Sequence, residues 1–135
     1  MADITCTAAQ VAPVFPDEAE IFDFVAAAAI TAGAPAYITS AGKVDNADAN
    51  GSGTDTFRGI ALSTVGAGQP VSVLKKGHVY GYTLSGAYDS LVYVSNTAGA
   101  LADAAGGTSL IVGRVVPLSD TPNYTKVLYV QASWA

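Results

Sequence analysis

The sequence has 135 residues, of which 50% are hydrophobic and 13% are charged, so it is typical of one folded domain and not of a disordered chain. The net charge is −5, and residues 1–55 hold eight acidic residues against Lys43 alone. Lys75 and Lys76 are the only adjacent basic pair, which argues against direct binding of nucleic acid, because neutralising phosphates requires clustered basic side chains.

Residues 1–16 are predicted to form an extended N-terminal arm, followed by a single β domain over 17–135. Pro13 and Pro16 disfavour a helix, and the apolar residues show no sustained period. The segment has too few apolar side chains to form its own core, so we expect it to be mobile in the free protein. Its start, MADITC, lacks the basic region of a secretory signal peptide, and Cys6 is the only cysteine, so no intramolecular disulfide is expected.

The next stretch, DEAEIFDFVAAAAI, fits two interpretations. Ile21, Phe24 and Val25 would share one face of a helix, and the acids before them suit a first helical turn. Phe22 and Phe24, however, alternate with Asp23 in the manner of a strand, and a turn, TAGAP, follows. We favour the strand and leave the helix open.

From Ala36 onward, short runs rich in β-branched and aromatic residues alternate with glycine-rich turns. Strands are predicted at seven runs, with KKG among the turns between them: AYIT, FRGIAL, PVSVL, HVYGYTL, LVYVS, SLIVGRVV and KVLYVQ. None of these runs has a convincing helical period. The predicted fold class is therefore all-β, a small β-barrel or β-sandwich of about seven or more short strands with the extended arm at its N-terminus.

An internal repeat divides the β domain into two halves, about 36–74 and 92–130. The halves are predicted to pair into one small barrel, and chance similarity within a β-rich composition is the alternative. The matching segments are AYITSAGKVD from Ala36 and VYVSNTAGALAD from Val92, GIAL from Gly59 and GRVV from Gly113, and VSVL from Val71 and VLYV from Val127.

The stretch NADANGSGTD, residues 46–55, alternates oxygen-bearing side chains in the manner of a calcium-binding loop. A helix-loop-helix calcium site needs a bidentate glutamate at loop position 12, and counting from Asn46 that position holds Phe57. Only Asp48 would carry charge among the nominal side-chain ligands. We therefore expect a polar surface loop that bonds its own backbone and connects strands, with no metal site.

No catalytic residue and no cofactor are predicted, so the sequence is not expected to encode an enzyme. His78 is the only histidine, and in HVYGYTL it shares strand parity with Tyr80 and Tyr82, which favours a structural or interface role. Motifs for nucleophilic, phosphate-binding or zinc chemistry do not occur. Trp134 is the penultimate residue, and we expect its large ring to pack against the body or a neighbouring subunit.

The stretches ITAGAPAYITSAGKV, FRGIALSTVGAGQPVSVLKKGHVYGYTL, VYVSNTAGAL and IVGRVV resemble the small capsid decoration proteins, or cement proteins, of tailed bacteriophages. The shared features are an AG-x-x-x-Y turn into a strand, a GIAL strand, AGQPVSV and a closing VGRVV segment. The resemblance covers roughly residues 28–130. It implies a small β-rich protein without catalytic motifs, often trimeric and similar in role to the lambda head decoration protein.

The resemblance also implies partners and binding residues. The partners would be the major capsid (coat) protein and further copies of the chain, as a homotrimer at threefold or quasi-threefold positions on the outer surface of the virion. The protein would be made in the host cytoplasm and would bind neither nucleic acid nor membrane directly. The expected capsid-binding arm residues are Asp3, Ile4, Thr5, Val11, Val14 and Phe15, and the expected subunit-interface residues are His78, Tyr80 and Trp134.

An alternative function is open at this point. The tyrosines of the predicted strands suit a sugar-binding platform, so a carbohydrate- or surface-binding β-module of a phage fibre or adhesin also fits the sequence.

Overall fold

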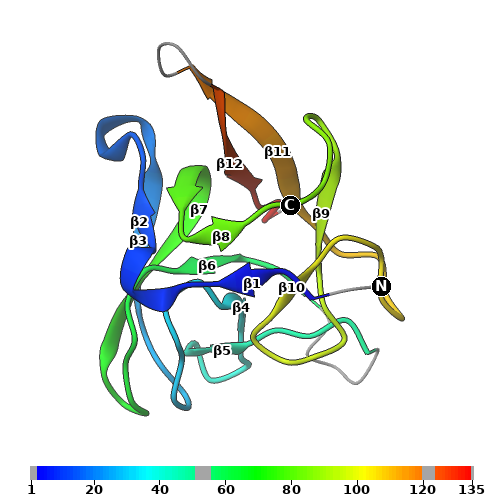
Figure 1. Cartoon of the computed structure of the whole chain (residues 1–135). Coiled ribbons are helices and arrows are strands. Elements are labelled where there is room, and N and C mark those ends of the chain that lie inside the picture. The colour runs from blue at the N-terminus through cyan, green and yellow to red at the C-terminus, as the bar shows by residue number, and fades with distance from the viewer. Residues whose placement is uncertain (1–2, 51–55, 120–123, 135) are drawn as a thin grey trace.

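The structure is a computed structural model that describes residues 3–50, 56–119 and 124–134 (Figure 1). It confirms the all-β class, with two single-turn 3-10 helices, η1 (Ala8–Gln10) and η2 (Pro16–Glu18), as the helical elements of these residues. The strands are β1 (Thr5–Cys6), β2 (Ala12–Pro13), β3 (Glu20–Val25), β4 (Pro35–Ile38), β5 (Val44–Asn46), β6 (Gly59–Ala61), β7 (Pro70–Tyr80), β8 (Tyr82–Thr83), β9 (Leu91–Val94), β10 (Leu101–Ala102), β11 (Ile111–Ser119) and β12 (Tyr124–Gln131).

Eight of these strands form one antiparallel path that curls into a half-barrel, in the order β10-β9-β11-β12-β7-β6-β4-β5. The two ends of the path are tied together after β5, where Ala49 N donates to Ser95 O at 2.8 Å and Gly99 N donates to Ala47 O at 3.0 Å. β2 and β3 pair with β7 outside this path, and β1 pairs with β8 as a separate two-stranded sheet. The β11–β12 hairpin extends beyond the rest of the sheet (Figure 1).

The path has the same strand order on both sides of its central β7–β12 pair. One side reads β5-β4-β6-β7 and the other reads β10-β9-β11-β12. Each half also contains a short hairpin, in which Ile38 pairs with Val44 in β4–β5 and Val94 pairs with Leu101 in β9–β10, and the second hairpin loop is one residue longer. These are the segments that the internal repeat aligns, so the repeat corresponds to a common topology.

Each half has a glycine after its hairpin, Gly59 in the first and Gly113 in the second, and both are needed for the same physical reason. A Cβ atom at Gly59 would lie 2.6 Å from Leu74 O on β7, and a Cβ atom at Gly113 would overlap Tyr129 O on β12. In both halves, the backbone of the neighbouring strand occupies the space of a side chain. Glycine is therefore required at both positions for the strands to pair at this distance.

The strand interpretation of DEAEIFDFVAAAAI is confirmed by β3, whereas the expected turn at KKG is wrong. Residues 75–77 lie inside β7. Gly77 packs against Ala19, with a register shift in the β3–β7 pair between Glu20 and Ile21. A bulge of this kind bends a strand without reversing it.

The single strand expected at HVYGYTL is interrupted at Gly81. A Cβ atom there would lie 3.1 Å from Val11 Cα, so the chain turns around Val11 and enters β8. Tyr82 consequently packs against the core, whereas Tyr80 is exposed. The expectation that His78, Tyr80 and Tyr82 share one face is therefore wrong for Tyr82.

The core has two parts, one on each side of the first half of β7. Val71 and Val73 belong to a small cluster with residues of β4, β5 and β6, while Leu74 and Val79 belong to a larger cluster that draws on both halves. Burial on both faces explains why PVSVL is almost continuously apolar. Val11 joins the larger cluster, so the core includes the N-terminal segment.

Candidate functional site

Exposed large apolar side chains gather around residues 12–25. Several large apolar side chains exposed close together on a folded domain mark a candidate surface for a partner, and here they lie on both faces of β3, with Phe22 on one and Ile21 and Val25 on the other. We call this region the N-terminal apolar surface. Six of the exposed large apolar residues lie in residues 12–25 or next to them: Phe15, Ile21, Phe22, Val25, Tyr80 and Trp134.

Part of this surface is a row of three rings that crosses β7. The centroid of the His78 ring lies 5.2 Å from that of Phe15 and 4.9 Å from that of Tyr129, which is its pairing partner on β12. A hollow of about 200 Å³ adjoins the row, and Glu18 and Lys76 contribute to its wall. The row thus combines apolar ring surface with one carboxylate and one ammonium group.

Trp134 forms the other part of the surface by packing on β3. Its ring centroid lies 4.9 Å from that of Phe22, and its Nε1 donates to Arg58 O at 2.8 Å. Lys75 Nζ lies 5.1 Å from the Trp134 ring centroid, and Arg58 Nη1 donates to Ser133 O at 3.0 Å. The tryptophan is therefore docked against the body, one of the two expected possibilities, yet it is still 39% exposed.

The structure thus places the three expected subunit-interface residues around β7. His78 and Tyr80 lie on β7 itself, and Trp134 lies beside Lys75 of the same strand. Tyr80 is 40% exposed and is paired with Ala12 of β2. A contact of these residues with another subunit stays a prediction.

The first residues of the expected capsid-binding arm lie along the body of the protein. They connect the N-terminus to β8 and to the second half of the sheet, which holds them in an extended conformation. Asp3 accepts a hydrogen bond from the Ser95 hydroxyl, Ile4 N donates to Leu101 O at 2.8 Å, and Thr5 pairs with Thr83.

The later arm residues are held more firmly. Val11 is 9% exposed within the larger core cluster, Val14 N donates to His78 O at 2.9 Å, and Phe15 contacts the His78 ring. Residues 3–16 therefore pack against the body in the structure, and the mobility of the free arm stays a prediction. The segment cannot form a core alone, but Val11 completes a core that other elements form. Binding of these residues to a coat protein stays a prediction.

Cys6 and Tyr82 form the link between the N-terminal segment and the body. They are paired in the β1–β8 sheet, and the Tyr82 hydroxyl donates to Gly33 O at 2.5 Å. Burial raises the pKa of Tyr82 well above 10.0, and the neighbouring Cys6 charge raises it further. Burial also raises the pKa of the Cys6 thiol from 9.0, so neither group is prepared for nucleophilic chemistry.

The stretch NADANGSGTD is more buried than expected over residues 47–49. Asp48 is 7% exposed, and its Oδ1 accepts a hydrogen bond from Asn50 N at 3.3 Å. Ala47 and Ala49 pack into the larger core cluster, because they bond to the β9–β10 hairpin, so the expected surface loop is wrong here. Residues 51–55 lie outside the described residues. Among those described, no three His, Cys, Asp or Glu residues are grouped to hold a metal ion.

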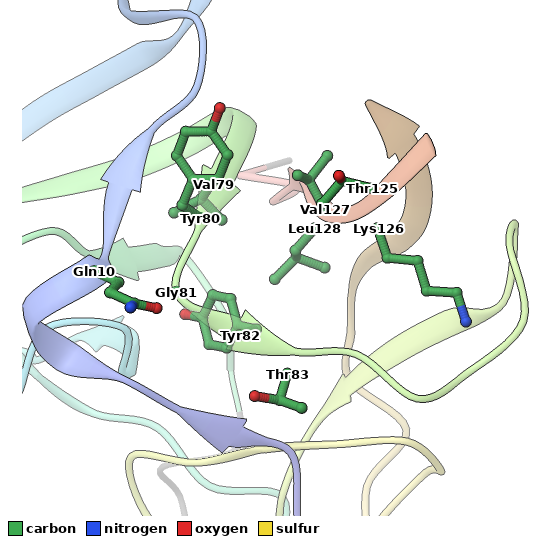
Figure 2. A pocket seen from close by; sticks show the side chains of 10 residues that line it. All are labelled: Gln10, Val79, Tyr80, Gly81, Tyr82, Thr83, Thr125, Lys126, Val127 and Leu128. Carbon is green, nitrogen blue, oxygen red and sulfur yellow. The ribbon is translucent and has the colours of Figure 1, made fainter. Parts of the chain in front are cut away.

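A second hollow, of about 430 Å³, lies between β8 and the outer part of β12 (Figure 2). It forms because β12 pairs with β7 only over residues 128–131, while β7 ends at Tyr80 and the chain turns away at Gly81. Lys126 borders it, but its Nζ donates to Gly86 O at 2.6 Å and lies 5.3 Å from the Tyr88 ring centroid. The cation is thus engaged within the protein.

Comparison with protein-family models found no match, and comparison with curated protein sequences found none either. The resemblance to decoration proteins therefore rests on the sequence motifs alone. Within the ranges that the structure describes, no helix has the length and apolarity that crossing a membrane requires.

Sequence reasoning did not select Ile21, Phe22 and Val25 as binding residues. A detectable signal was present, because β3 has apolar residues at both odd and even positions around Asp23. Such a strand is ordinarily buried on both faces. In this fold β3 flanks the long strand β7, so five of its six residues are exposed.

Proposed function

We propose that the protein is a structural capsid decoration protein that binds the outer surface of a phage head and stabilises the shell against the pressure of the packaged DNA. The observation that carries the proposal is the N-terminal apolar surface, where Phe15, Phe22 and Trp134 are each 39–41% exposed. This surface belongs to the region in which decoration proteins of the resembled family engage the coat protein.

The role requires buried area and a rigid body. Shell pressure strains the junctions between coat subunits, and a bound protein resists that strain by adding contacts across the junction. A standard interface buries about 800 Å² per partner, an area that gives anything from weak to tight binding. The curled sheet, with its ends tied together after β5, supplies a stiff support for such a contact.

A homotrimer would multiply that contact. Three linked copies bind with a high effective concentration, and a threefold assembly matches a threefold junction of the shell. The acids of residues 1–55 and the bases of the later residues favour head-to-tail packing of neighbouring copies. His78, Tyr80 and Trp134 are the residues proposed near these contacts.

The test mixes purified protein with expanded, undecorated heads of the phage that encodes it and images the heads by electron microscopy. We expect regular added lobes in sets of three at threefold or quasi-threefold positions. Heads with no added density would refute the capsid role, and single copies at hexamer centres would refute the trimer. Heads already saturated with the protein serve as the control for specific sites.

The row of Phe15, His78 and Tyr129 favours a second candidate, a carbohydrate-binding module of a phage fibre or adhesin. Sugars stack on aromatic rings, and Glu18 and Lys76 beside the row would supply polar contacts. A glycan array decides between the candidates. Saturable glycan binding that Tyr129→Ala abolishes, without binding to heads, would support the second candidate in place of the first.

A further inference from the structure

β3 is an edge strand with apolar side chains. Among the residues that the structure describes, β3 pairs with β7 alone, and the opposite edge of β7 is paired with β6 and then with β12. Ile21 is 36% exposed, and Phe22 and Val25 are each 41% exposed. Edge strands usually carry short, charged or proline-containing sequences that prevent pairing with another chain, so an edge strand with four apolar residues among its six is unusual.

The hydrogen bonds around β7 show which backbone groups of β3 point outward. Leu62 N donates to Ser72 O, so Ser72 directs its carbonyl toward β6 and away from its pairing partner Asp23. Bonding alternates along an antiparallel pair, and Ala26 N donates inward to Gln69 O at 2.9 Å. Asp23 and Val25 therefore direct their N–H and C=O groups to the outer edge of β3.

The charges at this edge select among possible partners. Residues 15–25 contain four acids, Asp17, Glu18, Glu20 and Asp23, and no basic residue. Lys75 Nζ lies 3.7 Å from Glu20 Oε1. Among the described residues, this is the one ion pair that these four acids form. A second copy of β3 would bring the same acids together across the new pair, which like charges disfavour.

We propose that the outer edge of β3 receives an extended segment of the coat protein that carries basic and apolar side chains on both of its faces and adds to the sheet as a further strand. This inference rests on the proposed function. Main-chain bonds to Asp23 and Val25 would hold the segment, and its basic side chains would lie opposite Asp23 and Glu20. Its apolar side chains would cover Ile21, Phe22 and Val25.

The experiment measures co-sedimentation of the protein with undecorated heads. Val25→Pro removes one outward N–H and leaves the inward bonds to β7 intact, because proline is tolerated where an edge-strand N–H faces solvent. Val25→Thr is the matched control, since it keeps the N–H and the branched shape. We expect Val25→Pro to weaken head binding about tenfold or more, as loss of main-chain bonds worth about 1.4 kcal/mol predicts, and Val25→Thr to bind much as wild type does.

Two charge-reversal variants test whether the bound coat segment is basic. Asp23→Lys places a base opposite the incoming basic side chains, whereas Asp17→Lys makes the same change in η2, outside the strand. We expect Asp23→Lys to weaken head binding at least as much as Val25→Pro and Asp17→Lys to have a smaller effect. Equal binding by both charge variants would contradict a basic occupant.

Hydrogen exchange of the wild-type complex provides a second measurement that does not depend on the folding of a variant. We expect slower exchange of the Asp23 and Val25 amides on heads than in the free protein. Head binding with unchanged exchange at β3, or with full affinity in Val25→Pro, would overturn the inference and leave the capsid role standing. Absence of wild-type binding would instead overturn the capsid role and the coat segment together, and a wild-type dimer in solution that Val25→Pro dissociates would identify a second copy as the occupant.

Discussion

The two halves of the sheet share strand order, a short hairpin and a glycine that lies against the next strand, but they differ at the strand that closes each half. β7 carries β2 and β3 along its outer edge, whereas the matching edge of β12 over residues 124–127 borders a hollow of about 430 Å³. The N-terminal segment therefore covers one half only. Most of the large apolar side chains that are exposed among the described residues lie on or beside that segment, so the candidate function lies where the two halves differ.

This difference separates two kinds of sequence signal. Features that both halves share, such as Gly59 and Gly113, arise from the needs of the fold. The contact of Phe22 with Trp134 lies outside both halves and occurs beside one of them alone, so the shared topology does not require it. The predictions below test the shared features and the added segment, beginning with the largest expected effect.

The shared glycines should tolerate alanine least. Gly113→Ala would force a Cβ atom into Tyr129 O, and Gly59→Ala would place one 2.5 Å from Val73 Cγ1 and 2.6 Å from Leu74 O. We expect each change to lower the free energy of unfolding by about 3 kcal/mol, because backbone on the neighbouring strand has to move. Urea denaturation followed by circular dichroism measures this loss.

Gly66→Ala is the matched control, because the closest atom to a Cβ there is Gln69 Oε1 at 3.6 Å. It should change the free energy of unfolding by less than about 0.5 kcal/mol. A small effect of Gly113→Ala together with a large effect of Gly59→Ala would show that the two halves do not share this constraint.

The added N-terminal segment should contribute to stability through Val11. Val11→Ala removes buried methyl groups from the larger core cluster, so we expect a loss of about 2 kcal/mol in the free energy of unfolding. Gln10→Ala, at an exposed neighbour, should have little effect. Thermal melts of both variants measure the difference, and an unchanged melt of Val11→Ala would restore the view of residues 3–16 as a separate arm.

The sequence was sufficient for the fold class and for most strands, because β-branched runs and glycine-rich turns are local signals. It was insufficient at Gly77 and Gly81, where glycine marks contact with Ala19 and Val11 and not a simple turn. Such contacts join residues distant in the sequence. The same limit applies to the site, since the exposure of Phe22 depends on the position of β3 at the edge of the sheet.

Alkaline pH should weaken the attachment of the added segment. Burial raises the pKa of Tyr82 above 10.0 and that of Cys6 above 9.0, so the folded protein holds these protons more tightly than the unfolded chain. The associated stability is complete below about pH 9 and is lost as the pH rises above the ordinary pKa values toward the raised ones. We therefore expect the free energy of unfolding to fall progressively above that pH.

Tyr82→Phe separates the contribution of the Tyr82 hydrogen bond at neutral pH from the contribution of its raised pKa at alkaline pH. At pH 7 it should cost about 1 kcal/mol, because Gly33 O loses its hydrogen bond from the hydroxyl. Above pH 9 its stability should fall less steeply than that of the wild type. Urea denaturation at several pH values measures these slopes, and equal slopes in the two proteins would remove Tyr82 from the explanation.

The smallest expected effects concern the turns of the two shared hairpins. Gly42 and Gly99 have φ angles of 83° and 79°, so alanine at either position should cost about 1 kcal/mol of backbone strain. Gly99→Ala should cost slightly more, because its Cβ would lie 2.9 Å from Asn46 Oδ1, whereas a Cβ at Gly42 meets no atom within 4 Å. Gly42→Asn is the control, since asparagine adopts positive φ more readily than alanine and should recover part of the loss. A larger loss from Gly42→Ala than from Gly99→Ala in thermal melts would show that the Asn46 side chain moves aside, and that the two turns differ in backbone strain and not in packing.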